Sequence, residues 1–184
     1  MFKSNYFKLF MNINKVKYGK NLKLYGVPVI FKKKGSQLNI GENCTIKSSF
    51  LSNLVGLSQR TIIVTRTEEA KLNIGNNVGI SGATIYARKG ITIGDNTLIG
   101  GNVKIFDNDF HPIEVEARNI DNKEAIGTRE VVIAKNCFIG CNAIILKGTK
   151  IGNGSVVGAG SVVCGEFPAG VVIAGNPAKV IKTL

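Results

Sequence analysis

A six-residue period dominates the hydrophobic pattern in the second half of the chain. From residue 133 an aliphatic residue opens each unit, at Ile133, Ile139, Ile145, Ile151, Val157 and Val163. The fifth position of each unit is small, at Cys137, Ala143, Thr149, Ser155 and Ser161. The same rule recurs in other phases from Ile40, Ile74 and Ile93. A period of six fits neither an amphipathic helix nor an alternating strand, so it predicts a short strand and a turn in every unit.

Three such units make one triangular coil of about 18 residues, and stacked coils form a parallel β-solenoid with aliphatic ladders inside. Glycine, asparagine and aspartate between the strands supply turn conformations, some with positive φ. Cys44 and Cys137 occupy the small inward position, where we expect them to fill the core. The alternative is a β-sandwich with coincidental spacing, which the unbroken register disfavours. The predicted fold class is all-β.

Two stretches interrupt this register. Residues 47–71 contain the alternating run TIIVTRT and predict a widened coil with strands of its own. Residues 107–130 are long, polar and acidic, and a loop of that length within a compact fold is usually functional. Residues 1–20 mix aromatic and aliphatic residues with lysines and predict a short amphipathic helix, which would cap the solenoid, pack on a neighbour or rest on a membrane. Residues 21–184 form the solenoid and its C-terminal closing segment.

The net charge of +12 is unevenly distributed. Residues 1–34 hold nine lysines and no acid, whereas residues 107–130 hold seven of the twelve acids. A basic surface favours anionic ligands such as a phosphorylated cofactor, an acidic membrane face or nucleic acid, and it also serves solubility. No motif of a DNA- or RNA-binding domain is present, so we expect no nucleic-acid partner.

The sequence shows neither a membrane-spanning run nor a signal-peptide pattern, and this bears on the expected localisation and redox state. No apolar run approaches the roughly 20 residues needed to span a membrane, and the first residues do not have the pattern of a signal peptide. We therefore expect a cytoplasmic protein with reduced thiols. One histidine and four cysteines without a CxxC pair cannot complete the usual zinc sets, so no metal site is expected.

The tandem units, each an aliphatic residue, Gly, two variable residues and a small residue, resemble the hexapeptide-repeat acyltransferases. The resemblance runs from about Leu38 to Lys182, and it is greatest to the branch of maltose, galactoside and polysaccharide O-acetyltransferases. It implies a left-handed coil, acetyl-CoA as cosubstrate, direct transfer without an acyl-enzyme, and a homotrimer with active sites between chains. The implied acceptor is the hydroxyl group of a sugar or polysaccharide precursor.

His111 is the only histidine and stands in NDFHP, where the repeat stops and the loop begins. The family resemblance places the catalytic histidine here. Acyl transfer to a hydroxyl needs a group that removes the hydroxyl proton, and imidazole suits this role at neutral pH. His111 would then protonate the departing thiolate. A carboxylate that orients the ring could come from Asp107, Asp109 or Glu114, and the sequence does not choose among them.

The resemblance also suggests residues that bind the cofactor and the acceptor. The resemblance places the cofactor against small and basic residues near the C-terminal coils, at Gly140, Cys141, Gly158, Ala159, Lys179 and Lys182. A backbone N–H near Gly140 or Cys141 would stabilise the oxyanion. The resemblance places the acceptor near Ser81, and Ser81 and Arg88 both lie about one coil before His111. Asn102 is a further candidate, which also suits a turn.

Three other functions compete with O-acetylation. A carbonic anhydrase on the same kind of solenoid would need three zinc-binding histidines, which excludes it here. An N-acetyltransferase acting on an amino sugar uses the same proton transfer and stays open. A non-catalytic solenoid would have nearly the same sequence, although the NDFHP segment and the irregular loop argue against it.

Overall fold

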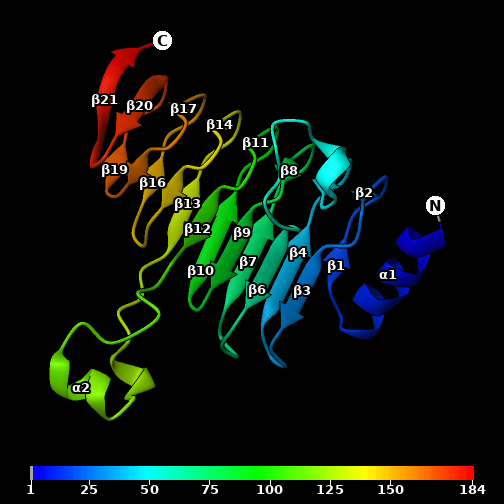
Figure 1. The fold of residues 1–184 in the computed structure, drawn as a ribbon, viewed down its shortest axis with the longest axis horizontal. Coiled ribbons are helices and arrows are strands. Elements are labelled where there is room, and N and C mark those ends of the chain that lie inside the picture. Colours follow the sequence, from blue (N-terminus) through cyan, green and yellow to red (C-terminus); the bar gives the residue numbers. More distant parts are fainter. Residues whose placement is uncertain (1) are drawn as a thin grey trace.

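The computed structural model describes residues 2–184, and the side chains of residues 2–6 and 10 lie outside the described part. The chain winds into a triangular prism whose three walls are parallel sheets (Figure 1). Successive strands pass from one sheet to the next, so each sheet takes every third strand of the solenoid. The first and last strands lie at opposite ends of the prism (Figure 1).

Sheet A contains seven parallel strands: β1 (Lys17–Tyr18), β4 (Gln37–Ile40), β7 (Lys71–Ile74), β10 (Gly90–Ile93), β13 (Val131–Ile133), β16 (Lys150–Ile151) and β19 (Glu166–Phe167). Sheet B contains eight: β2 (Lys23–Tyr25), β5 (Thr45–Lys47), β8 (Gly79–Ser81), β11 (Leu98–Ile99), β14 (Phe138–Ile139), β17 (Val156–Val157), β20 (Val171–Gly175) and the antiparallel β21 (Ala178–Thr183). Sheet C contains six: β3 (Val29–Lys32), β6 (Ile62–Thr65), β9 (Thr84–Ala87), β12 (Lys104–Phe106), β15 (Ile144–Ile145) and β18 (Val162–Val163).

The six-residue period determines the register of these sheets. Successive unit-opening residues enter sheets A, B and C in turn, and all are buried: Ile133, Ile139, Ile145, Ile151, Val157 and Val163. In sheet C, for example, Ile85 pairs with Ile105, and Ile105 with Ile145. The core is therefore a set of aliphatic ladders along the prism axis, which confirms the prediction of a parallel β-solenoid.

The small inward positions are buried as predicted. The Thr149 hydroxyl donates to the Val163 carbonyl at 3.0 Å, and the Ser155 hydroxyl donates to the Pro168 carbonyl at 3.0 Å, so one coil satisfies the polar atoms of the coil before it. Cys44 and Cys137 are 0% and 2% exposed, which confirms them as core residues. Burial raises the pKa of both thiols above its ordinary value.

Asparagine turns repeat along one edge of the prism. Asn77, Asn96 and Asn136 all have φ between 56° and 60°, the left-handed region that asparagine tolerates better than most residues. Their amides form a ladder, from Asn77 to Asn96 at 2.9 Å and from Asn96 to Asn136 at 3.1 Å. The turns thus stack in the same register as the strands.

Helix α1 (Phe2–Ile13) lies against the N-terminal end of the prism (Figure 1). Met11 is fully buried in the core cluster, and Phe7 packs against that cluster. Leu9 and Ile13 are exposed. These described side chains give the helix one buried and one exposed side. No helix within residues 2–184 is long and apolar enough to cross a membrane.

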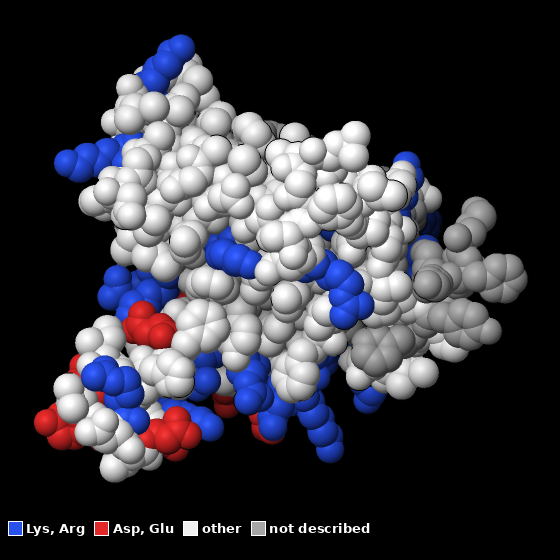
Figure 2. Space-filling view, in the orientation of Figure 1, with Lys and Arg blue, Asp and Glu red and all other residues white. Residues whose placement is uncertain are grey.

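Two segments leave the prism at different places (Figure 1). Residues 48–61 form the widened coil between β5 and β6 and contain the 3-10 helix η1 (Phe50–Ser52). Residues 107–130 connect β12 to β13 and carry α2 (Val115–Asn119) and the 3-10 helix η2 (Lys123–Ala125). On the face shown in Figure 2, most acidic side chains lie on this second segment, and basic side chains are spread over the rest.

Candidate active site

His111 stands on a tight turn that follows β12. The Asn108 side chain accepts the Phe110 N–H at 2.9 Å, and Phe110 adopts a φ of 64°. The Phe110 ring packs on Phe106 and Tyr86, with centroid separations of 4.9 and 5.0 Å. This packing holds the turn against the outer face of sheet C and leaves the His111 side chain exposed. The imidazole of His111 therefore faces solvent, while the turn that carries it is held in place by packing and a hydrogen bond.

Asp107 anchors the start of this turn. It is 0% exposed, and its carboxylate accepts the backbone N–H groups of Arg88, Lys89 and Gly90 at 2.7 to 2.8 Å. The Asn108 amide donates to it at 3.1 Å. The three backbone donors join the loop to the preceding turn of the solenoid, and the Asn108 amide adds a bond within the loop. Asp107 is thus committed to backbone groups and makes no hydrogen bond to the His111 ring.

The other two acids proposed to orient the ring also have different surroundings. Asp109 forms an ion pair with Lys147, and its N–H donates to the Gly127 carbonyl at 3.1 Å. Glu114 is exposed and precedes α2. Within residues 2–184, no carboxylate forms a hydrogen bond with the imidazole of His111. Nor does any group of three or more His, Cys, Asp or Glu side chains in that range gather as a candidate metal site.

The small residues predicted to bind the cofactor stack along the edge where sheet B turns into sheet C. Because Ile139 pairs with Val157, Gly140 and Gly158 follow at the same place in successive coils. A Cβ at Gly140 would lie 2.5 Å from the Ala159 nitrogen, so only glycine permits this stacking. We call Gly140, Cys141, Gly158 and Ala159 the B–C edge column.

Some backbone N–H groups at this edge have a carbonyl acceptor and others have none. The Gly140 N–H donates to the Val157 carbonyl at 2.8 Å, and the Asn142 N–H donates to the Gly101 carbonyl at 2.9 Å. Among the described residues, the N–H groups of Cys141 and Ala159 donate no such bond. Two backbone donors one coil apart therefore remain available at this edge.

The two lysines of the closing segment lie on β21. Lys179 pairs with Ala174, whose Cβ is 3.0 Å from the position that a Cβ on Gly158 would take. Ala174 thus lies one coil beyond Gly158, and Lys179 lies on the next strand after it. Lys182 pairs with Val172, further along sheet B. Both lysines are exposed. The structure brings Lys179 close to the column and places Lys182 further from it.

The three acceptor candidates separate into two places. Ser81 and Asn102 lie on the B–C edge under the widened coil. The Asn53 amide donates to the Ser81 hydroxyl at 3.1 Å, and the Asn102 amide donates to the Gly56 carbonyl at 2.8 Å. Arg88 stands at the opposite edge of sheet C, where its guanidinium donates to the Lys123 carbonyl at 3.2 Å and its Nε is buried without a partner.

Several contacts of this region join residues far apart in the chain and were not predicted. Lys147 ties the loop to the solenoid through Asp109, 38 positions away. Lys104 donates to Gln59 of the widened coil at 2.7 Å, and burial lowers its pKa. The aromatic pair Tyr86 and Phe106 supports Phe110. The six-residue register of sheet C is the one signal that could have found Tyr86 and Phe106, because it pairs them directly.

Within one chain, His111 and the B–C edge column are on opposite edges of sheet C. The column precedes β15, whereas His111 follows the end of β12, and these strands pair directly in parallel. A reaction that uses both groups therefore needs a ligand reaching across this sheet or a second chain that brings the two edges together.

Comparison with protein families gives two matches. The model of the bacterial transferase hexapeptide (six repeats) matches residues 130–165, and the model of the hexapeptide repeat of succinyl-transferase matches residues 90–116. Both matched stretches lie in the regular coils or at the start of the loop. The solenoid is a left-handed parallel β-helix.

Three relatives have related sequences. The putative lipopolysaccharide biosynthesis O-acetyl transferase WbbJ of Escherichia coli K12 is 34% identical over 169 residues, which cover 89% of this chain and 80% of the relative. A putative acetyltransferase of Dictyostelium discoideum is 40% identical over 62% of this chain, and the match spans 62% of that relative's length. A 53-residue stretch is 60% identical to a tetrahydropyridine-dicarboxylate N-acetyltransferase of Clostridium perfringens, of which it covers 22%.

Two solved structures share the fold. The polySia-specific acetyltransferase NeuO superposes with a TM-score of 0.67 and 25% identity, over 91% of this chain and 75% of NeuO. A galactoside acetyltransferase in complex with coenzyme A gives a TM-score of 0.56 and 26% identity, over 91% of this chain and 64% of its own. The similarity therefore extends over nearly the whole prism.

Proposed function

The chain belongs to the hexapeptide-repeat acyltransferases, and from this premise we propose that it transfers an acetyl group from acetyl-CoA to a hydroxyl of a sugar or polysaccharide precursor. The observation that carries the proposal is the exposed His111 on a turn held by Asp107, Asn108 and Phe110. Such a base needs a fixed position and access to two substrates at once.

In this mechanism His111 removes the proton of the acceptor hydroxyl as its oxygen attacks the thioester carbonyl. The resulting imidazolium then gives that proton to the departing thiolate. The free N–H of Cys141 is the candidate donor for the oxyanion, because neighbouring N–H groups are already bonded. No acyl-enzyme is required when both substrates are bound together.

Coenzyme A would lie along the B–C edge column. The glycines at 140 and 158 allow close approach of an elongated ligand, and Lys179 supplies positive charge beyond the column. The galactoside acetyltransferase with coenzyme A supports this cosubstrate. Because His111 and the column stand on opposite edges of sheet C, we propose that a trimer pairs one chain's His111 with its neighbour's column.

Sugar-type acceptors are supported by the names of two similar proteins. WbbJ is described as acting in lipopolysaccharide biosynthesis, and NeuO as specific for polySia. Acetylation of an amino sugar is the second candidate, which the short match to an N-acetyltransferase favours. The two reactions share the base and differ in the acceptor atom.

The test is thiol release from acetyl-CoA with a panel of sugars, amino sugars and nucleotide sugars, comparing the wild type with His111→Ala. We expect release with one acceptor class and a loss of about 100-fold or more in kcat/KM for the variant. His111→Ala should still be stabilised by acetyl-CoA in thermal unfolding, since the base does not hold the cosubstrate. Activity that survives the substitution would show that another group is the base.

A further inference from the structure

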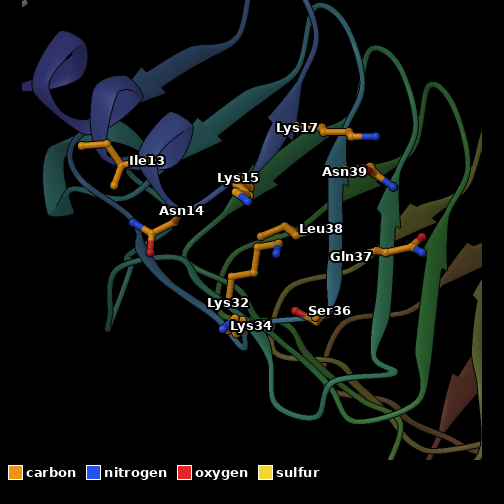
Figure 3. Close-up of a pocket in the computed structure, with 11 residues that line it drawn as sticks. Ile13, Asn14, Lys15, Lys17, Lys32, Lys34, Ser36, Gln37, Leu38 and Asn39 are labelled. Carbon is orange, nitrogen blue, oxygen red and sulfur yellow. The ribbon is translucent and has the colours of Figure 1, made fainter.

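A hollow of about 780 Å³ lies at the N-terminal end of the prism (Figure 3), and His111 is not among the residues that line it. It opens between the turn after α1, the strand β1 and the corner that joins β3 to β4 (Figure 3). Four lysines from these three segments line it, with an isoleucine and a glutamine among their neighbours: Lys15, Lys17, Lys32, Lys34, Ile13 and Gln37.

The charge of this hollow is unbalanced. No aspartate or glutamate lines it, and none of its four lysines forms an ion pair with a described residue. Glu68 packs behind Gly35 at the same corner but pairs with none of them. Four ammonium groups around one hollow repel each other, so a ligand that brings negative charge would relieve this repulsion.

Lys32 shows how the fold builds the hollow. It pairs with Thr65, and Thr65 with Ala87, and both of these residues are buried. Lys32 therefore occupies a core-facing position at the open end of the prism. A half-buried stem with a charged head is the usual arrangement of a lysine at the edge of an apolar surface.

One exposed aliphatic residue lines the hollow, and a second lies one turn earlier on α1. Ile13, on the rim, is 71% exposed, and Leu9 is 56% exposed. They are four positions apart on α1 and so share one face of the helix, while Met11 is buried in the core. A small soluble anion would use the lysines and leave both aliphatic side chains in water. A bilayer surface offers phosphate to the lysines and acyl chains to the aliphatic residues.

We propose that this end of the prism is a peripheral membrane-binding surface for anionic phospholipids. The headgroup phosphate occupies the lysine hollow, and Leu9 and Ile13 enter the interfacial layer. The inference is independent of the proposed reaction. The proposed surface includes lysines of residues 1–20 and also Lys32 and Lys34 at the corner between β3 and β4. The net charge of +12 acts in the same direction.

The test is sedimentation of the full chain with vesicles of phosphatidylcholine containing phosphatidylglycerol, compared with vesicles of phosphatidylcholine alone. We expect binding to the anionic vesicles only, weakening as salt is added. Lys15→Gln combined with Lys32→Gln should lower the partition coefficient about 25-fold, at about fivefold for each lysine near an anionic surface. Ile13→Ser should weaken binding without changing its dependence on salt.

The matched control is Lys135→Gln combined with Lys150→Gln, which removes the same charge from exposed positions elsewhere. It should bind like the wild type, and neither double variant should lower the rate of thiol release or the melting temperature. Equal binding by the hollow variant, equal loss in the control, or no binding by the wild type would each overturn the proposal. So would binding of inorganic phosphate or an oligonucleotide at the hollow without binding to vesicles.

Discussion

At the scale of single residues, Asp107 fixes the start of the loop 107–130 to the solenoid. Its buried carboxylate accepts hydrogen bonds from the backbone N–H groups of three consecutive residues, so this position needs oxygen acceptors. An asparagine at this position would replace one carboxylate oxygen by an NH₂ group. That group is itself a donor and cannot accept the backbone N–H bonds. The position thus requires an acid for structural reasons, although it stands only four residues before His111.

Asp107→Asn should therefore destabilise the protein by about 3 kcal/mol, which for a chain of this size lowers Tm by roughly 6 to 12 °C. Differential scanning calorimetry measures this directly. Asp121→Asn is the control, because that carboxylate is exposed and pairs only with Lys123 at the surface. Equal melting temperatures for the two variants would contradict the role assigned to Asp107.

At the scale of elements, the loop 107–130 is attached to the prism mainly near its two ends. We call these ends, residues 107–109 and 127–129, the neck of the loop. Asn108 forms an isolated bridge with Thr128, and the Arg129 N–H donates to the Asp107 carbonyl at 2.8 Å. The ion pair between Asp109 and Lys147 adds a tie to the solenoid. Beyond this neck, nearly all residues of α2 and η2 are exposed. The neck therefore controls where His111 stands.

Lys147→Met should loosen the neck with little effect on the prism. A half-buried ion pair contributing on the order of 1 kcal/mol should, once removed, speed proteolytic cleavage within the loop about fivefold. Limited proteolysis followed by mass spectrometry would locate the cuts. Lys150→Met, which removes the exposed pair with Glu166, serves as the control, and cleavage at the wild-type rate in Lys147→Met would refute the tie.

At the scale of the whole molecule, the proposed site needs two edges that one chain keeps apart. Closed symmetric assemblies bring different surfaces of identical chains together. We expect light scattering to give three times the 19.7 kDa of one chain. A monomeric mass would remove the basis of the shared site.

A mixing experiment tests the shared site itself. His111→Ala lacks the base, and Ala159→Trp blocks the column, so each alone should be inactive. Equal mixtures, unfolded and reassembled together, should recover about a quarter of wild-type activity, because about a quarter of the interfaces then combine two intact edges. No recovery, with trimers present, would mean that both groups act within one chain.

Much of this architecture could be predicted from the order of residues. The six-residue period places Ile133, Ile139 and Ile145 in three different walls, because each unit contains one strand and one turn. The same period predicts that Gly140 and Gly158 stack. It also isolates residues 107–130, since polar residues without the period cannot continue the ladders.

Contacts outside the repeat could not be predicted in this way. The sequence did not distinguish the three acids near His111, and only their partners in the fold do so. Asp107 binds three backbone amides, Asp109 pairs with a lysine, and Glu114 faces solvent. Likewise the sequence offered Ser81 and Asn102 as acceptor-binding candidates without showing that the widened coil forms hydrogen bonds with both. The partners come from distant, irregular segments that follow no period.

The solenoid, its core and the point where the repeat gives way to the loop all follow from the order of residues, because local periodicity dictates which side chains face inward. Contacts between different coils and irregular segments became known only from the three-dimensional fold. The fold brings Lys15 and Lys32 together around one hollow, pairs Lys147 with Asp109, and separates His111 from the B–C edge column. These relations depend on how coils stack and where loops return, which local patterns do not encode.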